Sequence, residues 1–130
     1  MADFDTVKAY LLELQLSIVH EVPEEALVVV EDEERGIKNL VVDCEDPIVI
    51  FEQMIMPIPS APGDMYRRLL QMNRTLVHGA FALDEDGTRV LFRDTLQLAH
   101  LDLNEVEGTI EALSLALAEH ADELIAFSHQ

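Results

Sequence analysis

The spacing of hydrophobic residues in the first part of the chain is that of a helix. From Asp3 to about Glu21 one stripe of apolar side chains recurs every three or four residues, as on one face of an amphipathic helix; it comprises Phe4, Val7, Leu11, Leu14 and Ile18. A second stripe comprises Leu12, Leu16 and Val19. A helix on a sheet needs only one apolar face, so the second stripe predicts a further contact, with another element or with a partner.

After Pro23 the pattern changes to short runs rich in β-branched residues. These runs predict three strands, Leu27 to Val30, Ile37 to Cys44 and Ile48 to Met56. The first two are joined by an acid-rich turn in which Gly36 supplies a positive φ, which indicates a hairpin. Prolines after Met56 end the third strand, because proline cannot donate a ladder hydrogen bond.

A helical pattern returns after the proline-rich bend. Ser60 is placed to cap a helix that has Pro62 in its first turn and continues to about Asn73. This helix carries the cluster Arg67, Arg68 and Arg74 in an otherwise acidic chain. Such a patch could meet an acidic patch on a second copy of the chain.

Two strands and a long helix are expected in the remainder. The strands run from His78 to Leu83 and from Thr88 to Leu96, and the Asp-Gly pair between them is a strong hairpin signal. The last helix begins near Asp102, which has capping-box spacing to Glu105. The predicted class is α+β, in the order α-β-β-β-α-β-β-α. No linker is long enough to divide residues 1–130, so we expect a single domain.

Composition and charge restrict the class of partner. Acidic residues number 26 against 8 basic ones, giving a formal net charge of −18. Such a surface repels nucleic acid and anionic membranes, so neither is an expected partner, whereas basic polypeptide segments are attracted. The alternative is that the charge only keeps the protein soluble. The acidic N-terminus lacks the pattern of a signal peptide, and no apolar run has the length of a membrane span, so we expect a cytoplasmic protein.

No catalytic or metal-binding motif stands out. The chain lacks a G-x-S-x-G elbow, a glycine-rich phosphate loop, H-E-x-x-H and C-x-x-C, and its five histidines show no ligand spacing. His120 is expected to be a semi-buried residue with a hydrogen-bond partner, and the single cysteine, Cys44, a small buried hydrophobe. We therefore expect no enzyme activity and no cofactor or metal. An enzyme whose site residues are far apart in the sequence is the remaining alternative.

Methionines gather around the proline-rich bend. They are Met54, Met56, Met65 and Met72. Flexible thioether side chains adapt to varied apolar partners, so they favour a binding surface, with core packing as the alternative.

Motifs in the second half of the chain resemble a known family. They are Leu69-Leu70-Gln71-Met72-Asn73-Arg74-Thr75-Leu76, His78-Gly79-Ala80-Phe81-Ala82-Leu83, Asp86-Gly87-Thr88-Arg89-Val90 and Leu96. This stretch is similar to the second half of the Tir-chaperone (CesT-type) type III secretion chaperones and of the related YbjN-like proteins. The predicted order of elements matches that fold over essentially the whole chain.

The resemblance implies a fold, an oligomeric state and a function. It implies an antiparallel five-stranded sheet flanked by helices, a homodimer, and a groove that holds an extended segment of a client or effector polypeptide. A YbjN-like regulatory or adaptor protein that binds a folded partner is the alternative. Expected client-binding residues are Leu12, Leu16, Val19, Val28, Val30 and Val49. The expected dimer seam includes Met65, Arg68, Leu69 and Met72.

Overall fold

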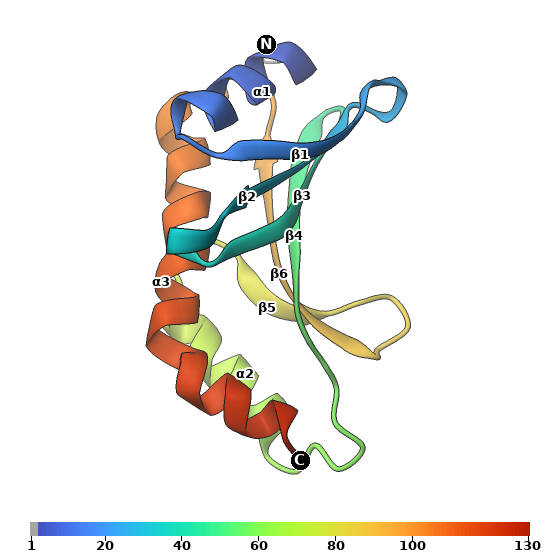
Figure 1. The fold of residues 1–130 in the computed structure, drawn as a ribbon, viewed down its shortest axis with the longest axis vertical. Coiled ribbons are helices and arrows are strands. Elements are labelled where there is room, and N and C mark those ends of the chain that lie inside the picture. The colour runs from blue at the N-terminus through green and yellow to red at the C-terminus, as the bar shows by residue number, and fades with distance from the viewer. Residues whose placement is uncertain (1–2) are drawn as a thin grey trace.

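The computed structural model describes residues 3–130, which form an antiparallel six-stranded sheet with helices packed against one face (Figure 1). The strands lie in the order β1-β2-β3-β4-β6-β5. Their bounds are β1 Ser17–Val22, β2 Leu27–Asp32, β3 Ile37–Glu45, β4 Ile48–Pro57, β5 Ala80–Leu83 and β6 Arg89–Gln97. The helices are α1 Phe4–Glu13, α2 Met65–Met72 and α3 Leu103–Ser128, of which α3 runs along one side of the molecule. The predicted α+β class is confirmed.

The first helix is shorter than the sequence predicted, and the expected five-stranded sheet has six strands over the described residues. The helix stops at Glu13 because the next turn is left-handed: Gln15 has φ 66°, and the amide of Leu16 donates to the carbonyl oxygen of Leu11 at 3.1 Å. The chain then continues as β1, where the β-branched Ile18 and Val19 favour an extended backbone.

The second helix also begins later than predicted. It starts at Met65 rather than near Ser60, because Gly63 has φ 55°, a left-handed conformation that a right-handed helix cannot contain. Other local signals are confirmed. Gly36 has φ 75° in the turn between β2 and β3, and the Asp102 carboxylate accepts a hydrogen bond from the amide of Glu105 at 2.9 Å at the start of α3.

The core is divided into two hydrophobic clusters. The larger one lies between the sheet and the α1 and α3 helices and is built around Phe51 and Phe92. The smaller one joins α2, β5 and the second half of α3, and it contains Met56, Met65 and Met72. Core packing therefore accounts for these three methionines. None of the helices in the described chain combines the length and the apolar character that crossing a membrane requires.

Candidate polypeptide-binding surfaces

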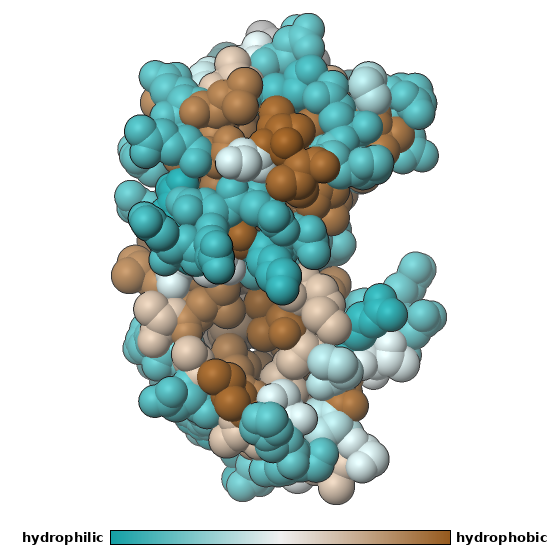
Figure 2. Space-filling model, in the orientation of Figure 1, coloured by the Kyte–Doolittle hydropathy of each residue, from teal (hydrophilic) through white to brown (hydrophobic). Residues whose placement is uncertain are grey.

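One exposed apolar surface lies where α1 meets β1. The Lys8 ammonium donates to the Glu21 carboxylate at 3.0 Å and so ties the helix to the strand. Leu12 lies one turn after Lys8 on the same side of α1 and is 56% exposed. Val19 occupies a bulge in β1 and is 49% exposed. In Figure 2, hydrophobic atoms gather over this end of the molecule.

The same surface borders a free strand edge. Within residues 3–130, β1 pairs only with β2, so its outer edge has backbone donors and acceptors available to another chain. We call the combination of Leu12, Val19 and the outer edge of β1 the β1 surface.

The structure separates the six client-binding residues expected from the sequence. Leu12 and Val19 are exposed on the β1 surface. The other four are buried in the larger core cluster, which removes them from any surface that a client could contact; they are Leu16, Val28, Val30 and Val49. The sequence pattern missed this distinction because it assigned Leu12, Leu16 and Val19 to one helix. A turn at Gln15 separates Leu12 of α1 from Leu16, which is buried just before β1, and from Val19, which lies in β1.

A second exposed apolar surface lies between α2 and β5. Tyr66 and Leu70 are one helical turn apart on α2 and are exposed, Leu70 by 70%. Together with Leu83 of β5 they border an apolar recess of about 340 Å³, whose floor includes Leu69 and Phe81. We call this the α2–β5 surface.

The four seam residues expected from the sequence lie mainly on the inner side of α2. Met65, Leu69 and Met72 are buried against the smaller core cluster. Arg68 pairs with Glu123 of α3 in the same protomer, with an Nη2 to Oε1 distance of 2.9 Å. This guanidinium hydrogen bond holds the pKa of Glu123 below its usual range. A dimer seam on α2 would therefore use Tyr66 and Leu70. They are four residues apart, like Met65 and Leu69, but lie on the exposed side of the helix.

The third surface is the face of the sheet opposite the helices. Side chains alternate along the central strands between a fully buried row and a half-buried row. The half-buried row is mostly apolar; it includes Leu27, Val29, Val41, Ile48, Ile50 and Leu91. None of the helices that the structure describes covers this row, since the core clusters form on the other face. We call it the open sheet face.

One carboxylate stands among these apolar side chains. Asp43 on β3 lies between Leu27 of β2 and Ile50 of β4 in the register of the sheet. Its Oδ1 atom is buried and has no hydrogen-bond partner among residues 3–130. Burial, the neighbouring Glu45, and then Glu25 and Glu52 raise the pKa of Asp43 to about 6.

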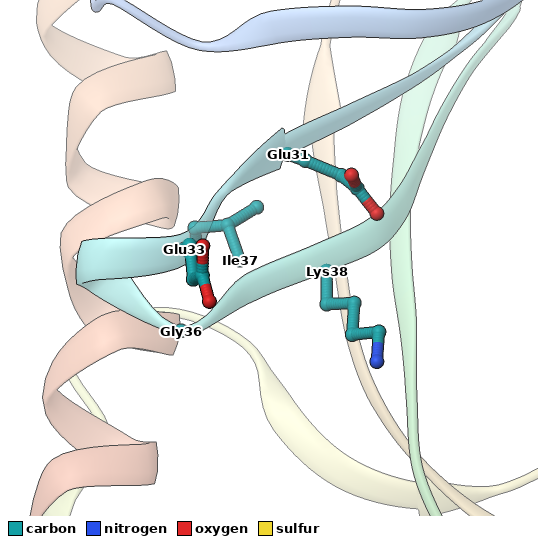
Figure 3. Close-up of a pocket in the computed structure, with 5 residues that line it drawn as sticks. All are labelled: Glu31, Glu33, Gly36, Ile37 and Lys38. Carbon is teal, nitrogen blue, oxygen red and sulfur yellow. The ribbon is translucent and has the colours of Figure 1, made fainter.

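Other polar groups form no reactive constellation in the part of the chain that the structure describes. A hollow of about 280 Å³ lies at the end of the β2–β3 hairpin, where Figure 3 shows Glu31, Glu33 and Lys38 around Ile37. No group of three or more histidine, cysteine or acidic side chains within residues 3–130 is placed to hold a metal ion.

His120 is buried with a partner, as the sequence predicted. Its Nε2 lies 3.1 Å from the hydroxyl oxygen of Thr75, which itself donates to the carbonyl of Met72 at 2.7 Å. Because the Thr75 proton is used in that bond, Nε2 must be the donor to Thr75.

The CesT_Tir_1 family model matches residues 1–130, and the chain belongs to this family. Among solved structures, the fold is similar to that of YbjN from E. coli, with 17% identity, a TM-score of 0.69, and coverage of 93% of this chain and 92% of that one. It is also similar to a chain of the HopA1–SchA chaperone–effector complex, with 10% identity, a TM-score of 0.61, and coverage of 98% and 94%.

A further similar structure is the Yersinia pestis type III secretion chaperone SycH in complex with a fragment of YscM2. It has 17% identity, a TM-score of 0.55, and coverage of 97% of this chain and 100% of that one. No curated protein sequence matches the chain. The resemblance to the secretion-chaperone and YbjN fold is thus confirmed over nearly the whole length.

Proposed function

We propose that the protein is a non-enzymatic, homodimeric chaperone that holds an extended segment of a client polypeptide on its β1 surface. The observation that carries the proposal is the coincidence of a free strand edge with the exposed Leu12 and Val19. An extended segment could add to β1 through main-chain hydrogen bonds while its alternate side chains contact these two residues. Membership of the CesT_Tir_1 family and likeness to secretion chaperones support this function.

Electrostatics support a basic client segment. The net charge of −18 attracts such a segment at long range and speeds its approach. The affinity should therefore fall as salt is added, because exposed charges are screened within about 8 Å at physiological ionic strength.

The α2–β5 surface supports the homodimer. An apolar recess flanked by an exposed helix face is suited to a symmetric contact in which Leu70 of each copy enters the recess of the other. Sedimentation equilibrium at micromolar concentration tests this. We expect a dimer for the native chain and for Leu115→Asp, which changes an exposed leucine on α3, and a monomer for Leu70→Asp. A native chain that sediments only as a monomer would refute the dimer.

Client binding is tested by a comparative pull-down from the native host, followed by mass spectrometry. The bait proteins are the native chain, the double variant Leu12→Ser/Val19→Ser and the control Leu115→Ser, all at exposed positions. We expect the same client with the native chain and the control, and its loss with the double variant at an unchanged melting temperature. Normal capture by the double variant would show that the β1 surface is not the client site.

A YbjN-like adaptor role is the second candidate, favoured by the TM-score of 0.69 with YbjN. The two roles differ in the state of the partner. A chaperone's client binds as an extended segment, so a synthetic peptide that spans the contact should bind as tightly as the whole partner. An adaptor that binds a folded partner should lose binding when that partner is unfolded.

A further inference from the structure

The open sheet face places a carboxylate among apolar side chains, a combination that is unfavourable in an isolated protein. Its half-buried apolar side chains come from the four neighbouring strands β2, β3, β4 and β6, and Leu27, Asp43 and Ile50 form one row across it. A carboxylate between two apolar neighbours has lost part of its hydration, and the unpartnered Oδ1 shows that no protein donor among the described residues replaces the lost water.

The charged groups around Asp43 make this arrangement less stable still. Glu45 on the same strand, Glu25 in the turn before β2 and Glu52 on β4 all act on it as like charges. Arg93 on β6 is the nearest cation across the sheet by register, but it bonds to Glu52 at 3.0 Å. The Asp43 carboxylate is therefore a destabilising group in the free protein, and a cation placed beside it would remove that cost.

We propose that the open sheet face is a second docking surface for polypeptide, and that Asp43 selects a segment in which one lysine or arginine is flanked by apolar side chains. The cation pairs with the Asp43 carboxylate, and its apolar neighbours cover Leu27 and Ile50. The proposal extends the proposed function, since the occupant is a part of the client that the β1 surface does not reach.

A second copy of this chain is a poorer occupant. Two copies meeting through this face would bring Asp43, Glu45 and Glu52 of one copy against the same groups of the other, and these like charges repel. Four of the 8 basic residues are already in ion pairs within the described protomer, namely Lys8, Arg35, Arg68 and Arg93. A cation from a basic segment of a different chain meets neither obstacle.

The site can be tested without a client, using a small cation that resembles an arginine side chain with an apolar stem. The probe is hexylguanidinium, and hexanol is its uncharged control. Binding is followed at pH 7.5 from the methyl NMR signals of Leu27 and Ile50, in the native chain, in Asp43→Asn and in Glu85→Gln, which changes an exposed acid in the turn between β5 and β6. The two variants lose the same charge, so a general attraction to an acidic protein affects both equally.

We expect hexylguanidinium to shift the Leu27 and Ile50 signals in the native chain and in Glu85→Gln. The affinity of Asp43→Asn should be about tenfold lower, the loss expected for one hydrogen bond to a charged group. In the native chain the affinity should also fall between pH 7.5 and pH 5, because Asp43 becomes protonated there, and it should stay constant in Asp43→Asn.

Three results would overturn the proposal. One is equal affinity of Asp43→Asn and the native chain for hexylguanidinium, and another is equal binding of hexanol and hexylguanidinium, which would indicate apolar docking alone. The third is a change in the sedimentation of Asp43→Asn that indicates a second copy on this face. Because the probes need no client, these results are independent of whether Leu12 and Val19 capture one.

Discussion

The side-chain amide of Asn73 binds the backbone of Phe81 at both of its ends. Its Oδ1 accepts from the Phe81 amide at 2.7 Å, and its Nδ2 donates to the Phe81 carbonyl at 3.1 Å. Both backbone groups of one strand residue point to the same side, and here they point away from β6. Asn73 thus occupies the place where a further strand would add to β5, which leaves β1 as the sheet edge better suited to accept a client segment.

Replacing Asn73 should loosen β5. Asn73→Ala leaves both backbone groups of Phe81 without these partners. We therefore expect the free energy of unfolding to fall by about 1 to 3 kcal/mol, the net contribution of two hydrogen bonds. Urea denaturation measures the loss. Gln71→Ala is the control, since Gln71 is exposed and bonds to the side chain of Arg68. A fall of less than about 0.5 kcal/mol for Asn73→Ala, the range of an ordinary surface change, would contradict this role.

Leu12 and Leu16 form a matched pair that separates binding from folding. Leu16 is 2% exposed in the larger core cluster, whereas Leu12 is 56% exposed. Leu16→Ala should lower the free energy of unfolding by about 2 to 5 kcal/mol. Leu12→Ala should change it by no more than about 0.5 kcal/mol. Thermal denaturation of the two variants tests this difference. Equal melting temperatures would show that the turn at Gln15 does not divide the two residues as described.

The sequence predicted most elements because their local signals agree with their tertiary environment. The Asp-Gly turn, Gly36 and the capping residue Asp102 are short-range features, and each is present where it was expected. The first helix was predicted too long because Ile18 continues the helical spacing of Leu14 by chance. The change to a strand depends on the left-handed turn at Gln15, a residue that carries no strong turn preference.

Surface residues were harder to predict than the fold. An apolar residue at the correct spacing can lie on the core side or the outer side of a short helix, and spacing alone does not distinguish the two. For this reason the sequence placed Met65, Leu69 and Met72 at a dimer seam. In the structure these three side chains are buried in the smaller core cluster, whereas Tyr66 and Leu70 are exposed. Asp43 carried no signal in the sequence, because its burial arises from neighbours on β2 and β4 that are distant in the chain.

The raised pKa of Asp43 predicts how stability depends on pH. A carboxyl whose pKa is higher in the folded state binds protons more tightly there, so its contribution favours folding below pH 3.8 and is lost as pH rises through about 6. The shift corresponds to about 3 kcal/mol at most, and we expect about 1 to 2 kcal/mol because the side chain is only partly buried. Asp43→Asn should therefore be more stable than the native chain at pH 8, and the advantage should disappear near pH 4. Urea denaturation at the two pH values measures it, and an advantage that does not vary with pH would contradict the assignment.

Gln53 joins β3 to β4 beyond the point where their ladder ends. The last paired residues are Val41 and Glu52, and past them the buried Gln53 side chain accepts from the Lys38 amide at 3.0 Å and donates to the Gly36 carbonyl at 3.1 Å. The Gln53 side chain thus replaces main-chain hydrogen bonds that the ladder would make if it continued. It holds the β2–β3 hairpin against the rest of the sheet.

Gln53→Leu keeps the size of the side chain but removes both hydrogen bonds. We therefore expect the free energy of unfolding to fall by about 2 to 4 kcal/mol, and hydrogen exchange at the Lys38 amide to become faster.

Gln53→Glu separates the contributions of the two hydrogen bonds. Its carboxylate still accepts from Lys38 but cannot donate to Gly36, whereas the protonated acid can do both. Burial raises the pKa of such a carboxyl. Relative to the native chain, Gln53→Glu should therefore gain stability as pH falls from 8 to 4.5, while the exposed control Gln97→Glu should not. Unfolding in urea at both pH values measures this, and equal pH dependence of the two glutamate variants would show that the Gly36 bond does not contribute.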